Sequence, residues 1–360
     1  MNLSYDQDDT KDDWQQIRQH AKALGFGSID VTDCDLSSYH KHYHEWTENH
    51  FHGDMGYMTK HGDKRLYPEQ LVPNTQCAIV VTLDYLTQKI DLKQVKQALS
   101  NRSEKAVMSQ YALGRDYHKV IRKKLQSLAN YITTLYPEHQ YRVFTDSAPV
   151  LEKPLAEKAG IGVIGKHGNL LNKHHGSFFF IGVIYTNIPF ETKQKKLEDI
   201  CGKCSACIKI CPTNAIVSPK VVDARKCISY LTIENKGVIP IEFRKAIGTR
   251  IYGCDDCQLI CPWNKYASLT KEKDFFPKAF FTSPNLIDLF SWTEAEFLKN
   301  TEGSAIRRIG YHCWQRNLAI ALGNAPYSKK LLTTLQESLT ITVDLIVRES
   351  IEWALMQHKS

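Results

Sequence analysis

Eight of the eleven cysteines fall within one segment of the 360-residue chain, and their spacing is suited to binding iron. The first run reads C-x2-C-x2-C-x3-C and the second reads C-x2-C-x3-C, each followed by proline, with one further cysteine between them. Thiolates spaced in this way hold iron–sulfur clusters, so the segment predicts electron transfer. The eight cysteines are Cys201, Cys204, Cys207, Cys211, Cys227, Cys254, Cys257 and Cys261.

Each run matches the motif of two-cluster bacterial ferredoxins, in which the cysteine before the proline ligates the other cluster. That rule assigns four cysteines to one [4Fe–4S] cluster: Cys201, Cys204, Cys207 and Cys261. The second cluster takes three more: Cys211, Cys254 and Cys257. It lacks the leading cysteine of the first run, since no cysteine stands shortly before Cys254, where the chain reads Tyr252 and Gly253. Cys227 is the unassigned cysteine of the segment, so we expect it to complete the second cluster.

Two other interpretations of these cysteines fit less well. Structural zinc usually takes two separated C-x2-C pairs, whereas this chain repeats a longer run that ends in proline. Disulfide frameworks are typical of short secreted chains, and this chain begins MNLSYDQDDTKDDW, without an apolar run after a basic start. We therefore expect a cytoplasmic protein, and no apolar stretch of the sequence reaches the length that spans a membrane.

The formal net charge of +7 is unevenly distributed along the chain. The segment 201–262 contains nine Lys or Arg against five Asp or Glu, a net charge of +4. A basic surface beside the clusters would attract a polyanion such as nucleic acid. Solvated lysines without a partner are the alternative interpretation.

Three regions separate along the chain, and together they predict an α+β fold. Residues 1–194 mix the two kinds of element: 77–85 and 178–186 read as buried strands, and 12–24 and 117–136 as helices. We expect Asp12 or Asp13 to cap the first helix and Gly25 to end it. The cluster segment follows over residues 195–270.

Residues 271–360 form the third region, which is predicted to be mostly helical. The stretches 305–322 and 329–357 have the spacing of paired amphipathic helices, as in a HEAT-like repeat. A plain helical cap on the other two regions explains the same pattern equally well.

The motif TDSAPVLEKPLAEKAGIGVIGKHGNLL, at 145–171, carries the main candidate for catalysis. Asp146 follows the apolar YRVF and precedes a predicted helix over 150–159. An aspartate at such a junction often only caps the helix. The glycines that follow would let the backbone approach a large ligand closely, although they do not match a nucleotide-binding spacing.

Several of these stretches, in this order, resemble epoxyqueuosine reductases: HGDMGYM, YALGRDYH, TDSAPVLEKPLAEKAGIGVIGK, CGKCSACIKICPTNAI, DARKCISYLTIE and IPIEFRKAIGTRIYGCDDCQLICPWNK. The resemblance implies two [4Fe–4S] clusters and cobalamin bound in a reductive-dehalogenase-like α/β domain. It also implies a tRNA substrate, an external electron donor, and reduction of epoxyqueuosine at the wobble position to queuosine. The chain departs from the usual family pattern at Val163 and Val183.

The resemblance also implies roles for individual residues. Asp146 would be the catalytic acid, and we expect burial or a nearby negative charge to raise its pKa. Asp146 and eight further residues are the candidates to contact cobalamin: Arg65, His118, Lys166, Asn169, Ser229, Tyr230, Asp255 and Asp256. Six basic residues are the candidates to contact tRNA phosphates: Lys236, Arg244, Lys245, Arg307, Arg308 and Arg316.

Two functions of other classes remain open at this point. One is a cobalamin-dependent reductase of a small molecule, similar to the reductive dehalogenases. The other is a ferredoxin-type electron carrier with appended domains, which would leave the N-terminal region without a role. Iron–sulfur absorption without corrinoid bands would favour the carrier.

Overall fold

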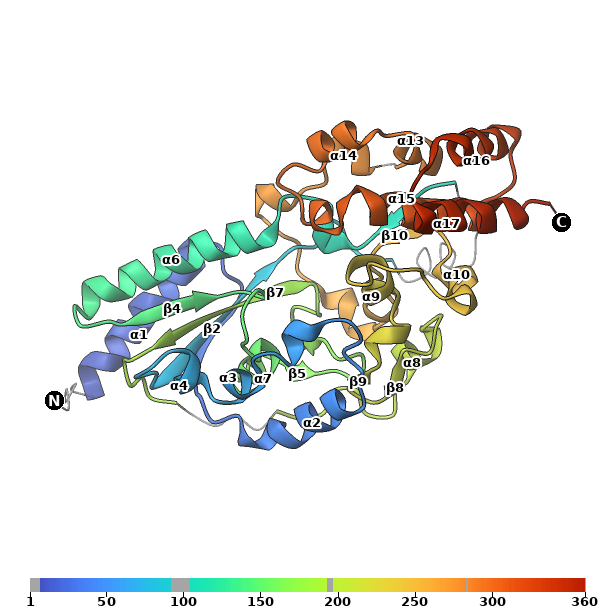
Figure 1. Cartoon of the computed structure of the whole chain (residues 1–360). Helices are drawn as coiled ribbons and strands as arrows, with labels where there is room; N and C mark the ends of the chain where they lie inside the picture. The colour runs from blue at the N-terminus through green and yellow to red at the C-terminus, as the bar shows by residue number, and fades with distance from the viewer. Residues whose placement is uncertain (1–6, 92–103, 193–196, 283, 360) are drawn as a thin grey trace.

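A computed structural model gives the fold of the chain (Figure 1) and describes residues 7–91, 104–192, 197–282 and 284–359. The N-terminal region is built on a four-stranded sheet of order β1-β2-β7-β4, in which all neighbouring strands are antiparallel. Its strands are β1 (Ile29–Asp33), β2 (Cys77–Asp84), β7 (Phe179–Thr186) and β4 (Tyr141–Phe144).

Helices cover both faces of this sheet, which explains why its inner strands are apolar along their whole length. Successive side chains of a strand point to opposite faces. Ile79 therefore packs in one core with α1 (Gln7–Ala23) and α6 (Tyr117–Leu135), whereas Val80 packs in another core with α7 (Glu152–Lys158). The described part of this region includes three further helices: α2 (Ser37–Glu48), α3 (Gly62–Leu66) and α4 (Pro68–Leu71).

The glycine-rich motif forms a small antiparallel pair after α7. Its strands are β5 (Val163–Ile164) and β6 (Leu170–Leu171). The loop between them includes Gly168, whose φ of +80° favours glycine. Val163 and Val183 are both buried in the protein core.

The cluster segment consists of short elements joined by loops. In chain order they are α8 (Ala206–Ile210), β8 (Ile216–Ser218), β9 (Val221–Val222), α9 (Ile228–Ile233), α10 (Ile241–Ile247), β10 (Arg250–Tyr252) and α11 (Asp256–Leu259). Strand β10 pairs in parallel with β3 (Val107–Met108), so the segment is joined to the N-terminal region by backbone hydrogen bonds.

The C-terminal helices pack onto the cluster segment (Figure 1). They are α12 (Ala279–Thr282), α13 (Leu286–Phe290), α14 (Glu294–Asn300), α15 (Gly310–Asn324), α16 (Lys329–Ile341) and α17 (Leu345–Met356). Helix α15 is the central one: Trp314 is fully buried, and the helix shares one core with α9, β10 and α17. Short 3-10 helices occur at η1 (Gly56–Met58), η2 (Gln110–Ala112), η3 (Ala224–Lys226), η4 (Pro262–Tyr266), η5 (Lys273–Phe275) and η6 (Ala305–Ile309).

The mixed α+β class predicted from the sequence is confirmed, and the two buried strands lie within one residue of their expected ends. The expected start of the first helix is wrong, because α1 already begins at Gln7 and so contains Asp12 and Asp13. Polar residues on the solvent side of an amphipathic helix do not end it. Among the described residues, no helix is both long and apolar enough to cross a membrane. The region boundaries at 194/195 and 270/271 stay predictions.

Candidate active site and metal centres

The eight cysteines of the cluster segment form two adjoining groups in space. Cys261 of the second run lies within electrostatic range of three thiols of the first run: Cys201, Cys204 and Cys207. This is the exchange of ligands between runs that the ferredoxin motif predicts. Cys207 and Cys261 are buried, whereas Cys204 is exposed.

The second group surrounds Cys257, which lies within range of Cys227, Cys211 and Cys207. The spacing of the first run would place the missing cysteine of the second run at position 251, where the side chain of Ile251 is fully buried in the protein core. Among the described residues, no three His, Cys, Asp or Glu side chains have the arrangement of a single-ion site.

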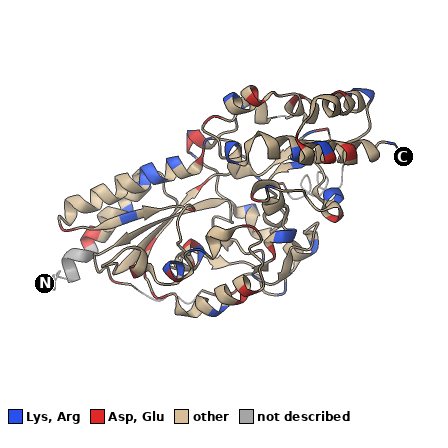
Figure 2. Ribbon diagram, viewed as in Figure 1, with Lys and Arg blue, Asp and Glu red and all other residues tan. Residues whose placement is uncertain are grey.

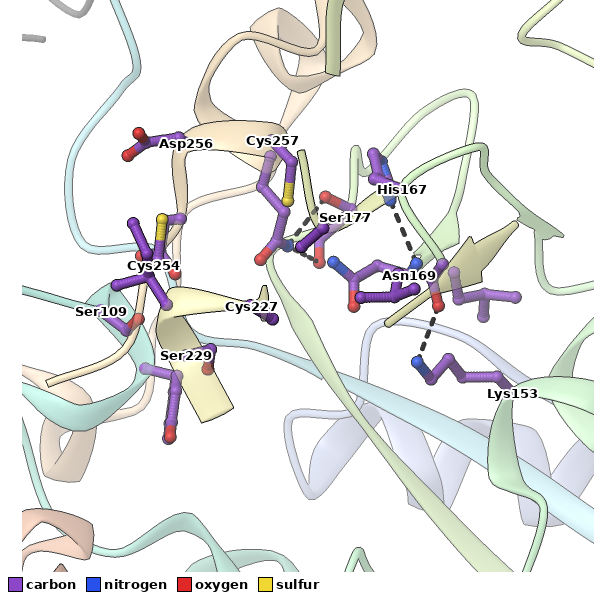
Figure 3. A pocket seen from close by; sticks show the side chains of 18 of the residues that line it. Ser109, Lys153, His167, Asn169, Ser177, Cys227, Ser229, Cys254, Asp256 and Cys257 are labelled. Carbon is purple, nitrogen blue, oxygen red and sulfur yellow. Dashed lines mark hydrogen bonds between the residues drawn. The ribbon is translucent and has the colours of Figure 1, made fainter. Parts of the chain in front are cut away.

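One cavity of about 480 Å³ joins the second cysteine group to the predicted catalytic aspartate. Its wall includes Cys227 and Cys254 together with Asp146. Figure 3 shows Cys227 and Cys254 toward one side of this cavity and Lys153 and Asn169 toward the other. The cavity can therefore bring an electron-transfer centre and a proton donor to the same bound molecule.

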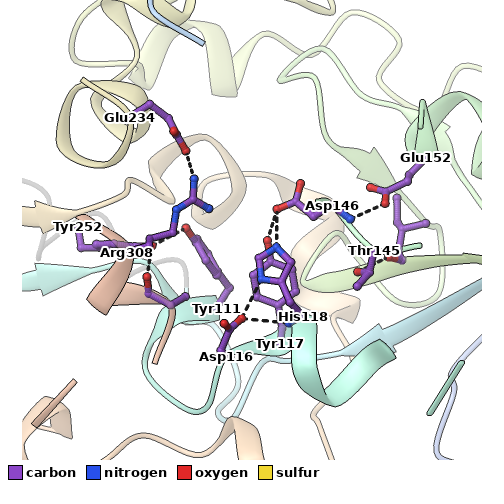
Figure 4. A network of polar contacts seen from close by, with 12 residues as sticks. Tyr111, Asp116, Tyr117, His118, Thr145, Asp146, Glu152, Glu234, Tyr252 and Arg308 are labelled. Carbon is purple, nitrogen blue, oxygen red and sulfur yellow. Dashed lines mark hydrogen bonds and ion pairs between the residues drawn. The ribbon is translucent and has the colours of Figure 1, made fainter. Parts of the chain in front are cut away.

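Asp146 does not cap the helix that follows it. Helix α7 has no side-chain cap, and Asp146 adopts a φ of +55°, which few non-glycine residues do. Its carboxylate accepts a hydrogen bond from the hydroxyl of Tyr117 and lies 3.4 Å from Nε2 of His118 (Figure 4). The other ring nitrogen of His118, Nδ1, lies 2.8 Å from Oδ1 of Asp116. The cap interpretation is therefore wrong for this chain.

The expectation of a raised pKa for Asp146 is also wrong. Burial acts to raise the pKa of Asp146, but the hydrogen bonds with His118 and Tyr117 outweigh it and hold that pKa below its usual value. The carboxyl group with a raised pKa is that of Glu152: burial, and then the charge of Asp146, bring the pKa of Glu152 to about 8. Burial lowers the pKa of His118, but its bonds with Asp116 and Asp146 outweigh burial and raise this pKa to about 9.

Five of the nine predicted cobalamin contacts line the cavity: Asp146, Asn169, Ser229, Asp255 and Asp256. Neither Val163 nor Val183, where the chain departs from the family pattern, is among the lining residues.

The other four predicted contacts lie outside the cavity wall. Lys166 donates to the carbonyls of Gly202 and Cys204, at 2.6 and 2.9 Å. The hydroxyl of Tyr230 donates to Asp54 Oδ2 at 2.8 Å. The remaining two are Arg65, which is 6% exposed, and His118, which reaches the site through Asp146.

Sequence reasoning missed several residues of the cavity wall. Glu152 and Lys153 stand in the same motif as Asp146, and Tyr117 stands in YALGRDYH beside His118. Their position in these motifs could have identified them as candidate site residues from the sequence. His167 stands in the motif of Asp146 as well; its Nε2 is buried without a hydrogen-bond partner, and burial lowers the pKa of its ring to about 4.

Two of the predicted phosphate contacts are contradicted by the structure. Arg316 is 0% exposed and donates to the carbonyls of Asn235 and Leu231, at 2.9 and 3.0 Å. Arg244 is also 0% exposed and forms an ion pair of 2.8 Å with Glu349. Both guanidinium groups hold the packing of the C-terminal helices together, and a phosphate cannot reach them.

Four of the predicted phosphate contacts are exposed: Lys236, Lys245, Arg307 and Arg308. Arg308 pairs with Glu234, and both arginines line a smaller cavity of about 390 Å³ that also includes His118 (Figure 4). This places Arg307 and Arg308 next to the polar network of Tyr117, His118 and Asp146. Lysine and arginine are otherwise spread over many elements (Figure 2).

Comparison with known families gives two matches along the chain. Residues 200–264 match the model of the "4Fe-4S double cluster binding domain". Residues 65–147 match the model of "Epoxyqueuosine reductase QueG, DUF1730". The first match favours two iron–sulfur clusters over a zinc site.

Full-length relatives decide the family. The chain is 53% identical over 350 residues to an epoxyqueuosine reductase of Francisella cf. novicida, with 96% of this chain and 97% of the relative covered. The chain belongs to the epoxyqueuosine reductase family. The epoxyqueuosine reductase of Escherichia coli K12 is 48% identical over 344 residues, with 96% and 89% covered.

Solved structures of epoxyqueuosine reductases share the fold. The Bacillus subtilis enzyme, with its catalytic aspartate loop swung out of the active site, matches with a TM-score of 0.86 at 26% identity, covering 97% of this chain and 91% of that one. A crystal structure with a tRNA-Tyr epoxyqueuosine-modified stem loop matches with a TM-score of 0.83 at 25% identity, covering 98% and 100%.

Proposed function

We propose that this chain reduces epoxyqueuosine to queuosine at the wobble position of tRNA, in the cytoplasm, with two [4Fe–4S] clusters and cobalamin. The family relationship supports the reaction, and one relative's structure holds a stem loop that carries epoxyqueuosine. The observation that carries the proposal is the shared cavity, since cluster cysteines and Asp146 line the same space.

The grouping of the thiols supports an assignment of ligands to the two clusters. One cluster takes Cys201, Cys204, Cys207 and Cys261, which are neighbours in space. The other takes the four cysteines that line the cavity: Cys211, Cys227, Cys254 and Cys257. The second cluster therefore delivers electrons at the cavity wall, and the first lies behind it.

The residues of the cavity fit a large ligand that carries many amide groups, as cobalamin does. His167 presents a buried Nε2 without a partner, Asn169 and Ser229 offer further polar groups, and Gly168 keeps the loop free of side-chain bulk. When bound, cobalamin would supply a reduced cobalt nucleophile that can open a strained ring. The chain's own residues would hold it between the cysteine wall and Asp146.

Conversion of an epoxide to an alkene consumes two electrons and two protons and releases water, so the site must supply two protons. Asp146 lies between two groups that hold a proton at neutral pH. Glu152 accepts the backbone N–H of Asp146, and His118 Nε2 lies 3.4 Å from its carboxylate. The raised pKa values of Glu152 and His118, about 8 and about 9, suit them to reload Asp146 after it protonates the leaving oxygen.

The tRNA stem loop would lie across the exposed basic residues near the smaller cavity. Arg307 and Arg308 border that cavity, and contacts of this kind fix the position of a nucleic acid without reading its sequence. Lys236 and Lys245 are exposed on the neighbouring cluster segment and would extend the same surface. A base flipped out of the loop would then enter the larger cavity beside Asp146.

The experiment that tests this function is a single-turnover assay with the reconstituted protein. Clusters and cobalamin are loaded, a low-potential reductant is added, and the nucleosides of an epoxyqueuosine-containing stem loop are analysed by mass spectrometry. We expect queuosine to form only when both cofactors are present. Iron–sulfur absorption with no corrinoid binding and no queuosine would instead support a ferredoxin-type carrier.

A further inference from the structure

One face of the cluster segment brings the first cysteine group to the protein surface. Cys204 is exposed, and a Cβ atom added at the neighbouring Gly202 would meet no other atom within 4 Å. Cys207 and Cys261 lie buried beneath this loop. The second group instead lines the inner cavity, so the first cluster is the one that a partner in solution can approach.

Lysine side chains surround this exposed loop. Lys166 donates to the carbonyls of Gly202 and Cys204, so its charge lies directly against the loop. Lys203 is exposed within the loop itself. Lys265 is exposed as well, with its Nζ 4.6 Å from the ring centre of Tyr266. We call Lys166, Lys203, Lys265 and Tyr266 the lysine face.

A hydrogen bond between the loops holds them together as one surface. The indole of Trp263 donates to the carbonyl of Ile200 at 2.9 Å, which ties the loop of Lys265 to the loop of Cys201. Among the described residues, neither Lys203 nor Lys265 forms an ion pair. Two acids precede this loop: Asp199 Oδ1 accepts the backbone N–H of Cys201, and Glu198 forms an ion pair of 3.1 Å with Lys173. The three lysines of the lysine face outnumber these two acids, so the surface keeps a net positive charge.

Tyr266 adds an apolar contact at the edge of the lysine face, since its side chain is 49% exposed. Aromatic residues are enriched where proteins dock, and charge around a small contact speeds the encounter of transient partners. Electron-transfer complexes are typically small and short-lived. Such a docking site combines an exposed cluster, positive charge around it and an aromatic contact. The loop of Cys204, the surrounding lysines and Tyr266 provide these three features.

We propose that the lysine face is the docking site of an acidic, low-potential one-electron carrier protein, which reduces the first cluster. The inference rests on the proposed function, because that reaction consumes two electrons and the chain holds no source of them. Each docking event passes one electron from the reduced carrier to the cluster and leaves the carrier oxidised by one electron. Two such events, with two protons, balance the loss of the epoxide oxygen as water.

RNA is the other acidic partner that a basic face attracts, and the structure favours the carrier here. The exposed arginines Arg307 and Arg308 border a cavity beside the Asp146 network, where a base must arrive. The lysine face surrounds Cys204, whose cluster lies behind the one that lines the active cavity. Electrons entering at the lysine face and RNA bound near Arg308 can be accommodated at the same time.

The test measures cluster reduction by stopped-flow absorbance, without tRNA, in protein carrying both clusters. Reduced flavodoxin serves as the acidic carrier and reduced methyl viologen as a small cationic reductant. In the variant Lys203→Glu/Lys265→Glu, we expect the rate of cluster reduction by flavodoxin at low salt to fall by a factor of about ten or more, because the charge that steers the carrier is reversed. Reduction by viologen and affinity for the stem loop should be unchanged.

Two further variants control this measurement. Lys203 stands between two cluster ligands, and its replacement could disturb the cysteine loop. The single variant Lys265→Glu leaves that loop unchanged, and we expect it to lower the rate of reduction by flavodoxin by a smaller factor. Lys123→Glu reverses an exposed charge on α6, away from the cluster segment, and should leave the flavodoxin rate unchanged.

An unchanged flavodoxin rate in the double variant would overturn the docking site, and so would a loss of stem-loop affinity with the flavodoxin rate intact. Neither result depends on whether epoxyqueuosine is reduced. A failure of the proposed reaction would appear separately, in the assay with tRNA.

Discussion

Asp146 and Glu152 are joined by a hydrogen bond, in which the backbone N–H of Asp146 donates to Oε1 of Glu152 at 2.5 Å. The bond folds the segment after β4 into a turn and places two carboxyl groups at one side of the cavity. Two such groups ionise as a pair, because the charge of one opposes the charge of the other. Glu152 holds the proton and Asp146 the negative charge at neutral pH.

The first prediction concerns Asp146 as the residue that delivers the proton. Asp146→Asn keeps the size of the side chain and can still accept from Tyr117, but it carries no acidic proton. We expect turnover to fall about a hundredfold or more, the usual range for loss of a general acid. Clusters, cobalamin and stem loop should remain bound, as checked by iron content, absorption spectrum and filter binding. Near-normal single-turnover rates would remove Asp146 from the mechanism.

The second prediction concerns Glu152 and the pH profile. The pKa of Glu152 is raised to about 8, so its proton is present below that pH and is lost as pH rises through it. Wild-type turnover should therefore decline above about pH 8. In Glu152→Gln this proton source is absent, and Asp146 is reloaded by His118 alone, whose pKa is raised to about 9. We therefore expect a lower rate at pH 7 and a pH profile in which the decline near pH 8 is replaced by a decline near pH 9.

A purely structural role for Glu152 predicts a different result. Glutamine can still accept the N–H of Asp146, so a structural role would leave the shape of the pH profile unchanged. Glu69→Gln, an exposed residue of α4, is the matched control and should keep the wild-type profile.

The cluster segment could be predicted from the sequence, because its cysteines are closely spaced, and the family model over residues 200–264 confirms it. The motif at 145–171 pointed to Asp146, which the structure places in the cavity wall. Which carboxyl holds the proton was not readable, because it depends on hydrogen bonds from Tyr117 and His118 on another helix. Spacing along the chain does not report such contacts between distant elements.

The misassigned arginines show a second limit of the sequence. Arg316 was predicted to contact phosphate because it is a basic residue of the C-terminal helices, across which the tRNA was expected to lie. Residues 318–323, LAIALG, follow it without a polar side chain on any side of the helix, which is the pattern of a buried helix. That signal was available for Arg316. No comparable pattern surrounds Arg244, whose burial follows from its ion pair with Glu349 on α17.

The third prediction concerns Cys227 as the fourth ligand of the second cluster. Cys227→Ser should lower the iron content by up to about four irons per chain, since a [4Fe–4S] cluster needs four ligands. The first cluster should persist, as its electron paramagnetic resonance signal will show. Cys34→Ser, which changes a cysteine outside the cluster segment, is the control and should retain both clusters. Full iron content in Cys227→Ser would refute the assignment.

The last prediction concerns the stem-loop surface at Arg307 and Arg308. Protein cations that contact phosphates release counterions, so affinity falls as salt rises, with a slope set by the number of contacts. Replacing both arginines by alanine should weaken binding and reduce the slope of log affinity against log salt by about 1.5, the value for two contacts. Arg122→Ala, an exposed arginine of α6, should change neither quantity. If the double variant binds with an unaltered slope, the RNA lies on another surface. Because Arg308 also pairs with Glu234, the single variant Arg307→Ala separates a lost phosphate contact from a lost ion pair, and it should retain about half of the effect.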